Sequence, residues 1–79
     1  MNNLIVIESV EDGSIERDII GVASDMEKAK EMMWEYFGDK LIVYNIEDIR
    51  DSGIEYIFSI YCDEESYKII FRDYELNHI

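Results

Sequence analysis

Runs of apolar and β-branched residues alternate with short polar stretches along the chain, and this pattern predicts five β-strands. An Asp-Gly pair at 12–13 follows the first run and marks a hairpin turn, because glycine accepts the positive φ of primed turns. The acidic segment 63–66 is expected to form a second hairpin turn, between the last two strands. The predicted strands cover residues 4–10, 15–23, 41–46, 54–62 and 67–76.

Residues 24–37 predict the single helix. Ser24 and Glu27 have the spacing of a capping box, in which the Ser24 hydroxyl accepts a hydrogen bond from the Glu27 amide. Apolar residues recur at helical spacing along one side, and Gly38 can take the left-handed conformation after the last turn. The polar residues 47–53, which follow the third predicted strand, are expected to form a loop.

The elements follow in the order ββαβββ, which predicts a two-layer α+β domain: an antiparallel sheet with one helix packed on one face. A length of 79 residues is enough for a single domain, so residues 1–79 are assigned to one. In the fourth strand, Ile54 is expected on the same face as Tyr56 and Cys62. One helix cannot cover both faces of five strands, and the pattern leaves open which face it covers. The uncovered face is expected to carry Ile57, Tyr61, Ile70 and Tyr74.

An excess of acidic residues dominates the composition. The chain contains 19 Asp and Glu against 7 Lys and Arg, which gives a formal net charge of −12. Such a chain repels nucleic acid and anionic lipid, so direct binding to either is disfavoured, and it attracts basic protein surfaces. The single cysteine and the lack of a signal-peptide or membrane-helix pattern favour a cytoplasmic location.

The sequence contains no pattern that indicates catalysis, a cofactor or a metal site. The one histidine, His78, is next to last in the chain, and Cys62 is expected to be a small core residue. The acidic segments 47–51 and 63–65 lack the alternating ligands and central glycine of a calcium-binding loop. The glycines are isolated, so a phosphate-binding loop is not predicted. We therefore expect a binding protein and not an enzyme.

Carboxylates recur at four-residue intervals along the predicted helix, where like charges cost about 0.2–0.5 kcal/mol per pair. Two interpretations stay open: a solvated face that keeps a small protein soluble, or a docking strip for a basic partner. We take the helical acids and the acidic turn as the candidate partner-binding residues. They are Glu27, Glu31, Glu35, Asp39, Asp63, Glu64 and Glu65.

Small size, strong acidity, a single cysteine and the lack of a catalytic motif together resemble the small phage-encoded inhibitors of host machinery, among them anti-CRISPR proteins and DNA mimics. Residues 21–29, a predicted strand leading into a capped helix, are similar to a pattern in small phage and bacterial proteins. The resemblance implies an inhibitor that blocks the basic, nucleic-acid-binding surface of a host protein, and it assigns no individual residue. The alternative is a small interaction or scaffold module that forms a homodimer or docks a host protein through its open sheet face.

Overall fold

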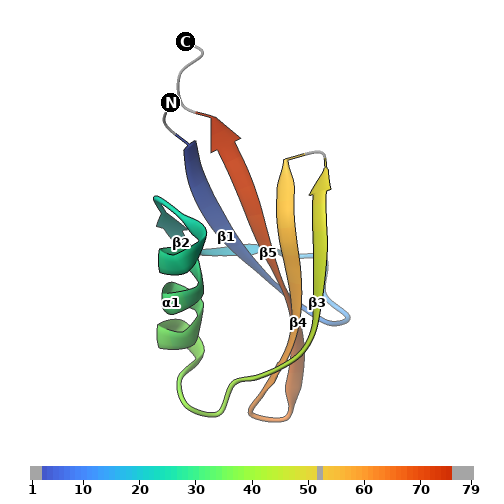
Figure 1. Ribbon diagram of the computed structural model, residues 1–79. Helices are drawn as coiled ribbons and strands as arrows, with labels where there is room; N and C mark the ends of the chain where they lie inside the picture. Colours follow the sequence, from blue (N-terminus) through green and yellow to red (C-terminus); the bar gives the residue numbers. More distant parts are fainter. Residues whose placement is uncertain (1–2, 52, 76–79) are drawn as a thin grey trace.

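The computed structural model of the protein describes residues 3–51 and 53–75. It contains one five-stranded antiparallel sheet and one helix (Figure 1), which confirms the α+β fold class. The elements are β1 (Asn3–Glu11), β2 (Asp18–Ala23), α1 (Met26–Phe37), β3 (Ile42–Asp51), β4 (Ile54–Cys62) and β5 (Glu65–Glu75).

The strands lie in the order β2-β1-β5-β4-β3, and every neighbouring pair is antiparallel. The chain leaves β2 at one edge of the sheet, passes through α1 and residues 38–41, and enters β3 at the opposite edge (Figure 1). The meander of β3, β4 and β5 then returns to the middle of the sheet. There β5 pairs with β1 over the whole length of β1. This pairing joins the β1–β2 hairpin to the β3–β4–β5 meander in one sheet.

The hydrophobic core lies on the face of the sheet that α1 covers. On that face Ile7 is opposite Phe71, and both side chains are fully buried. From α1, Ala29 and Met33 are fully buried, and complete burial of a methionine stabilises a fold by about 1.5–3 kcal/mol. The buried cluster consists of Ile5, Ile7, Ala23, Ala29, Met33, Leu41, Phe58, Ile60, Ile69 and Phe71.

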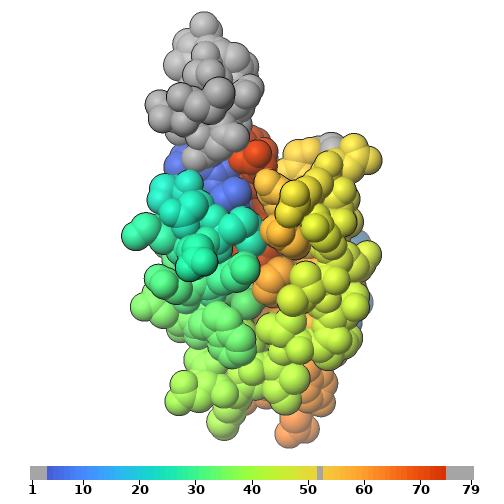
Figure 2. All heavy atoms as spheres, viewed as in Figure 1, coloured from blue at the N-terminus to red at the C-terminus, as the bar shows by residue number. Residues whose placement is uncertain are grey.

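The helix covers only part of this face. It packs mainly on β2 and β1, and Figure 2 shows atoms of β4 at the surface between those of α1 and β3. Ile46 of β3 lies opposite Phe58 but is exposed, because α1 does not reach that edge of the sheet. Neither α1 nor any other described segment forms a helix that is long and apolar enough to span a membrane.

The helix begins one residue later than the capping-box pattern predicts. Asp25 is the N-cap, with extended backbone angles, and its carboxylate accepts a 2.9 Å hydrogen bond from the Lys28 amide. The prediction of a Ser24 cap is therefore wrong. The two adjacent residues are both good caps, and the backbone bond from the Ala29 amide to the Asp25 carbonyl decides the register.

Residues 47–51 belong to β3 and do not form the predicted loop. Glu47 pairs with Ile57 and Asp48 with Tyr56 along the edge of the sheet. Polar side chains are tolerated there because an edge strand away from the helix needs no apolar face. The strand is irregular, with register shifts between Val43 and Asn45 and again after Asp48.

A second irregularity changes the assignment of faces in β4. The pairing with β5 shifts between Ile54 and Tyr56, so Ile54 lies opposite Arg72 whereas Tyr56 lies opposite Phe71. Adjacent residues 71 and 72 point to opposite faces of β5. Ile54 therefore does not share a face with Tyr56, and a bulge in the strand explains why simple alternation mispredicts it.

Candidate functional site

The helical acids form an exposed strip along α1. Glu27, Glu31 and Glu35 are four residues apart and are all exposed, and Asp39 follows the helix end. None of the ion pairs found among residues 3–51 and 53–75 involves these four carboxylates. The strip is therefore free to meet charged groups on another molecule.

The end of α1 turns the chain so that Asp39 projects into solvent. Gly38 takes a positive φ of 84°, and its amide donates a 2.8 Å hydrogen bond to the Trp34 carbonyl. The Leu41 amide then donates to the Gly38 carbonyl at 3.3 Å, and the Leu41 side chain is buried in the core. Between these two anchors, Asp39 and Lys40 are exposed.

The predicted acidic turn joins β4 to β5 in only two residues. Cys62 and Glu65 are the last paired residues, and Asp63 and Glu64 between them have φ values of 50° and 68°. Positive φ at both central positions is the geometry of a type I′ hairpin turn, which normally contains glycine or asparagine. A glutamate in this conformation is strained by about 1–2 kcal/mol, so the turn keeps a carboxylate where glycine would be relaxed.

The tertiary structure brings this turn to the C-terminal end of α1, at the lower end of the molecule in Figure 1. The Cys62 thiol donates a 3.6 Å hydrogen bond to the Phe37 carbonyl, and Lys40 Nζ lies 3.7 Å from an oxygen of Asp63. Glu35 therefore lies in the helix turn nearest to the hairpin. Glu27 lies about 12 Å from Glu35 along the helix axis, towards the other end of α1.

Two further carboxylates join this end, and the sequence reasoning missed them. The Asp12 amide donates a 2.9 Å hydrogen bond to the Ser66 carbonyl, which places Glu11 and Asp12 beside the β4–β5 turn. Their only signal in the sequence is their own acidity next to a turn. We call the combined group the acidic end. It consists of Glu11, Asp12, Glu35, Asp39, Asp63, Glu64 and Glu65.

Negative charges crowd one another at the acidic end. The pKa of Glu11 is raised above its ordinary value, first by a hydrogen bond with the Glu65 side chain and then by the charge of Glu65. Burial raises the pKa of Tyr67, and the charges of Glu65 and Glu11 raise it further. The ion pair of Lys40 with Asp63 gives little relief, because the two side chains are 80% and 71% exposed.

Most of the basic residues other than Lys40 lie away from the acidic end. Arg17 and Arg72 both pair with the buried carboxylate of Glu8, at 3.5 and 3.3 Å, on the sheet face opposite α1. On the same face Lys68 Nζ donates a 2.9 Å hydrogen bond to the Ser59 hydroxyl. Arg50 pairs with Asp48 at 2.9 Å in β3. The acidic end is therefore not neutralised by these side chains.

The alternative interface residues occupy the sheet face opposite the core, but they are not equally accessible. Tyr61 and Tyr74 are 41% and 48% exposed, Ile57 is partly buried, and Ile70 is buried. The loop between β1 and β2 folds over this face, behind β3 and β4 in Figure 1, and encloses a groove of about 390 Å³. Ile15 of the loop lines the groove and is 96% exposed.

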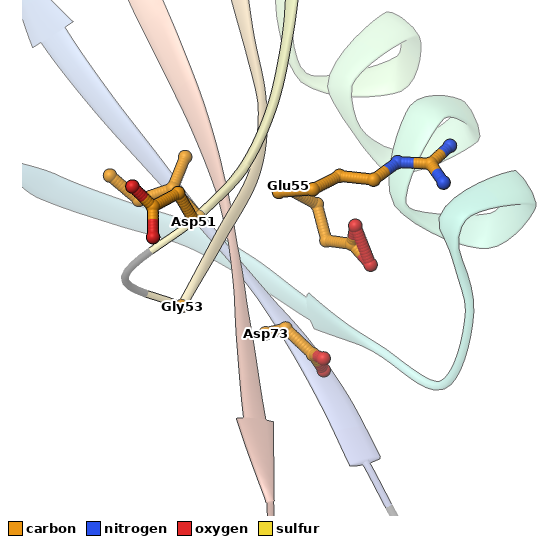
Figure 3. Close-up of a pocket in the computed structure, with 6 residues that line it drawn as sticks. Asp51, Gly53, Glu55 and Asp73 are labelled. Carbon is orange, nitrogen blue, oxygen red and sulfur yellow. The ribbon is translucent and has the colours of Figure 1, made fainter.

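A cavity of about 320 Å³ beside the β3–β4 turn is also lined by carboxylates (Figure 3). The carboxylate of Asp51 lies apart from those of Glu55 and Asp73 in this view. Within the described part of the chain, no group of three acidic, histidine or cysteine side chains is placed to hold a metal ion. Cys62 is buried, as predicted, and His78 lies outside the described residues.

Comparisons of the chain with protein-family models, with curated proteins and with solved structures give no match. The function must therefore be argued from the distribution of charge and apolar surface on the fold itself.

Proposed function

We propose that the protein is a non-enzymatic binding protein whose acidic end occupies a basic, nucleic-acid-binding surface of another protein. The observation that supports this proposal is the convergence of carboxylates from β1, α1 and the β4–β5 turn, with Lys40 as their only ion-pair partner within the described ranges. Unpaired carboxylates on a rigid scaffold attract cationic surfaces and steer the encounter over long range.

The amount of charge suggests which kind of surface fits. The molecule is 42 Å long and 23 by 21 Å across, and its formal net charge is −12. Over 42 Å, duplex DNA carries about 25 charges and one strand about 12, at one charge per ~1.7 or ~3.4 Å. The protein has the charge density of a single strand. A groove that accepts single-stranded nucleic acid is therefore the partner surface that we favour.

Inhibition of a host protein, the role that the resemblance to phage-encoded inhibitors implies, is the biological function that we propose for this binding. The acidic end would compete with nucleic acid for the same lysine and arginine side chains of the host effector. Competition needs no catalytic residue, cofactor or metal.

A pair of matched double variants tests the proposal. Glu35→Gln with Glu64→Gln removes two charges from the acidic end, and Glu47→Gln with Asp51→Asn removes two exposed charges from β3. Each tagged protein is used to retain binding proteins from host lysate at about 0.05 and 0.5 M salt. We expect the first variant to lose the protein that the wild type retains, and the second variant to keep it.

High salt should also release the protein that the wild type retains, as removal of the two charges does. Salt screens the attraction between charges, because the Debye length falls from about 10 Å at 0.1 M to about 3 Å at 1 M. The retained protein should also release bound single-stranded nucleic acid when the wild type is added. Equal retention by the two double variants, or retention that survives high salt, would contradict the proposal.

A second candidate function is a protein-interaction module that acts through the open sheet face. The nearly complete exposure of Ile15 beside an apolar groove favours it, since a large apolar side chain so exposed is typical of contact surfaces. In that case Ile15→Asp should abolish dimer formation or partner retention, and the acidic-end double variant should have little effect. Sedimentation equilibrium distinguishes a homodimer from docking to another protein.

A further inference from the structure

An aromatic and acidic cavity of about 330 Å³ lies between the end of α1, β1 and the start of β2. Its volume is at the lower end of the range for small-molecule pockets, about 300–1,000 Å³, so it suits a group the size of one side chain. Tyr36 and Phe37 line it from the helix and Tyr67 from β5. Glu16 lines it from the β1–β2 loop and Asp18 from the start of β2.

The charge of this cavity is wholly negative. Glu11, Glu16 and Asp18 line it, and no basic side chain does. The nearest cation in the sequence, Arg17, is drawn away to Glu8, whose side chain is on the other face of the sheet. The carboxylates around the cavity are therefore not neutralised by the neighbouring arginine, and a cation that enters meets a field of one sign.

The aromatic rings add a second form of attraction for a cation. Phe37 is the central ring, 5.0 Å from Tyr36 and 5.3 Å from Tyr67 between ring centroids. The faces of such rings carry partial negative charge and attract ammonium and guanidinium groups. The rings also provide an apolar wall for the methylene groups of a long basic side chain.

The cavity also contains a serine hydroxyl from the sheet. Ser9 of β1 lines the cavity and is 7% exposed. Its hydroxyl makes no hydrogen bond among the described residues, whereas the other serine hydroxyl in the cavity, that of Ser14, accepts from the Glu16 amide at 3.1 Å. A donor group that enters the cavity can donate a hydrogen bond to this hydroxyl.

We propose that this cavity binds the guanidinium group of an arginine side chain from the partner protein. Guanidinium has several donors in one plane, which suits acceptors at different positions around the cavity, and its flat face stacks on aromatic rings. Lysine offers a compact charge without the stacking surface. The assignment rests on the proposed function, because it names the partner group that anchors beside the acidic end.

A titration without any partner tests the cavity by itself. N-butylguanidinium is added to the protein at constant ionic strength, and the NMR signals of the Tyr36 and Tyr67 rings and of the Ser9 amide are followed. The neutral analogue N-butylurea has nearly the same shape and serves as the ligand control. We expect saturable shifts at these residues with the cation, and at least tenfold weaker binding of the urea.

Two charge-matched variants separate the cavity from the general field of the protein. Glu16→Gln with Asp18→Asn removes two carboxylates from the cavity wall, whereas Glu47→Gln with Asp51→Asn removes two from β3. All four side chains are exposed, so the fold should tolerate the changes. We expect at least a tenfold loss of N-butylguanidinium affinity in the first variant and less than a twofold loss in the second.

Non-saturable shifts, equal losses in the two variants, or equal binding of the urea would overturn the cavity assignment. These outcomes leave the proposed function standing if the acidic-end variant still loses its partner from lysate. Spermidine that binds the cavity more than tenfold tighter than an arginine-containing peptide would also overturn the assignment, in favour of a free polyamine.

Discussion

The thiol of Cys62, at the end of β4, donates a 3.6 Å hydrogen bond to the backbone carbonyl of Phe37, the last residue of α1. Cys62 is also buried, so the contact fixes the helix end against the sheet. It joins two acidic segments that are 24 residues apart in the chain, Asp39 and Asp63. This junction brings the helix end and the β4–β5 turn together within the acidic end.

Replacement of Cys62 should loosen the junction. Cys62→Ala removes a buried sulfur and its hydrogen bond, and we expect the free energy of unfolding in urea to fall by about 1 kcal/mol. Cys62→Val keeps the buried volume without the donor and should lose less. If Cys62→Ala is as stable as the wild type, the junction does not hold the two segments together.

The position of each glutamate along α1 should decide the sign of its effect on stability. Glu35 has acidic residues four positions before and after it, and the last turn of the helix contains no basic residue. Glu35→Gln should therefore raise the free energy of unfolding by about 0.5–1 kcal/mol. Glu27 lies in the first turn, where a negative charge interacts favourably with the helix dipole. Glu27→Gln should therefore lower the free energy of unfolding. Effects of the same sign in urea titrations would refute this explanation.

Strain at Glu64 should be measurable. Glu64→Gly relieves the left-handed conformation at φ 68°, and we expect a stabilisation of up to about 1 kcal/mol after the entropy cost of glycine. Glu47→Gly, in a strand with ordinary backbone angles, is the control and should destabilise by about 0.5–1 kcal/mol. The same Glu64→Gly variant should bind the basic partner more weakly, so that stability and affinity change in opposite directions.

The proximity of Glu11 and Glu65 should appear as a pH dependence of stability. The pKa of Glu11 is raised in the folded state, so folding favours the protonated form of this side chain. The repulsion between Glu11 and Glu65 is therefore relieved as the pH falls from neutrality towards the ordinary glutamate pKa of about 4.3. Glu65→Gln removes the source of the shift. It should raise the melting temperature above that of the wild type at pH 7, and the difference should shrink at lower pH. A difference that is constant with pH would show that the two carboxylates do not interact.

The sequence predicted the candidate surface in pieces. The strip of Glu27, Glu31 and Glu35 follows from helical spacing, because neighbours four residues apart share a face in any helix. That the C-terminal end of the helix meets the Asp63 turn does not follow, because the residues between them include a crossover to the far edge of the sheet. The contribution of Glu11 was missed for the same reason, since it depends on pairing with β5.

By itself the sequence determined the fold class, the number of strands and the acidity of the protein, because apolar periodicity and turn residues act over a few neighbouring positions. The second strand begins at Asp18 and not at the predicted residue 15. Only the tertiary structure decided that α1 covers the β1 and β2 side of one face, that β3 continues to Asp51 and that Ile54 changes face. It also decided where the carboxylates converge. These features depend on the pairing of distant strands and on bulges in them, and a pattern of adjacent residues contains no information on which strands become neighbours.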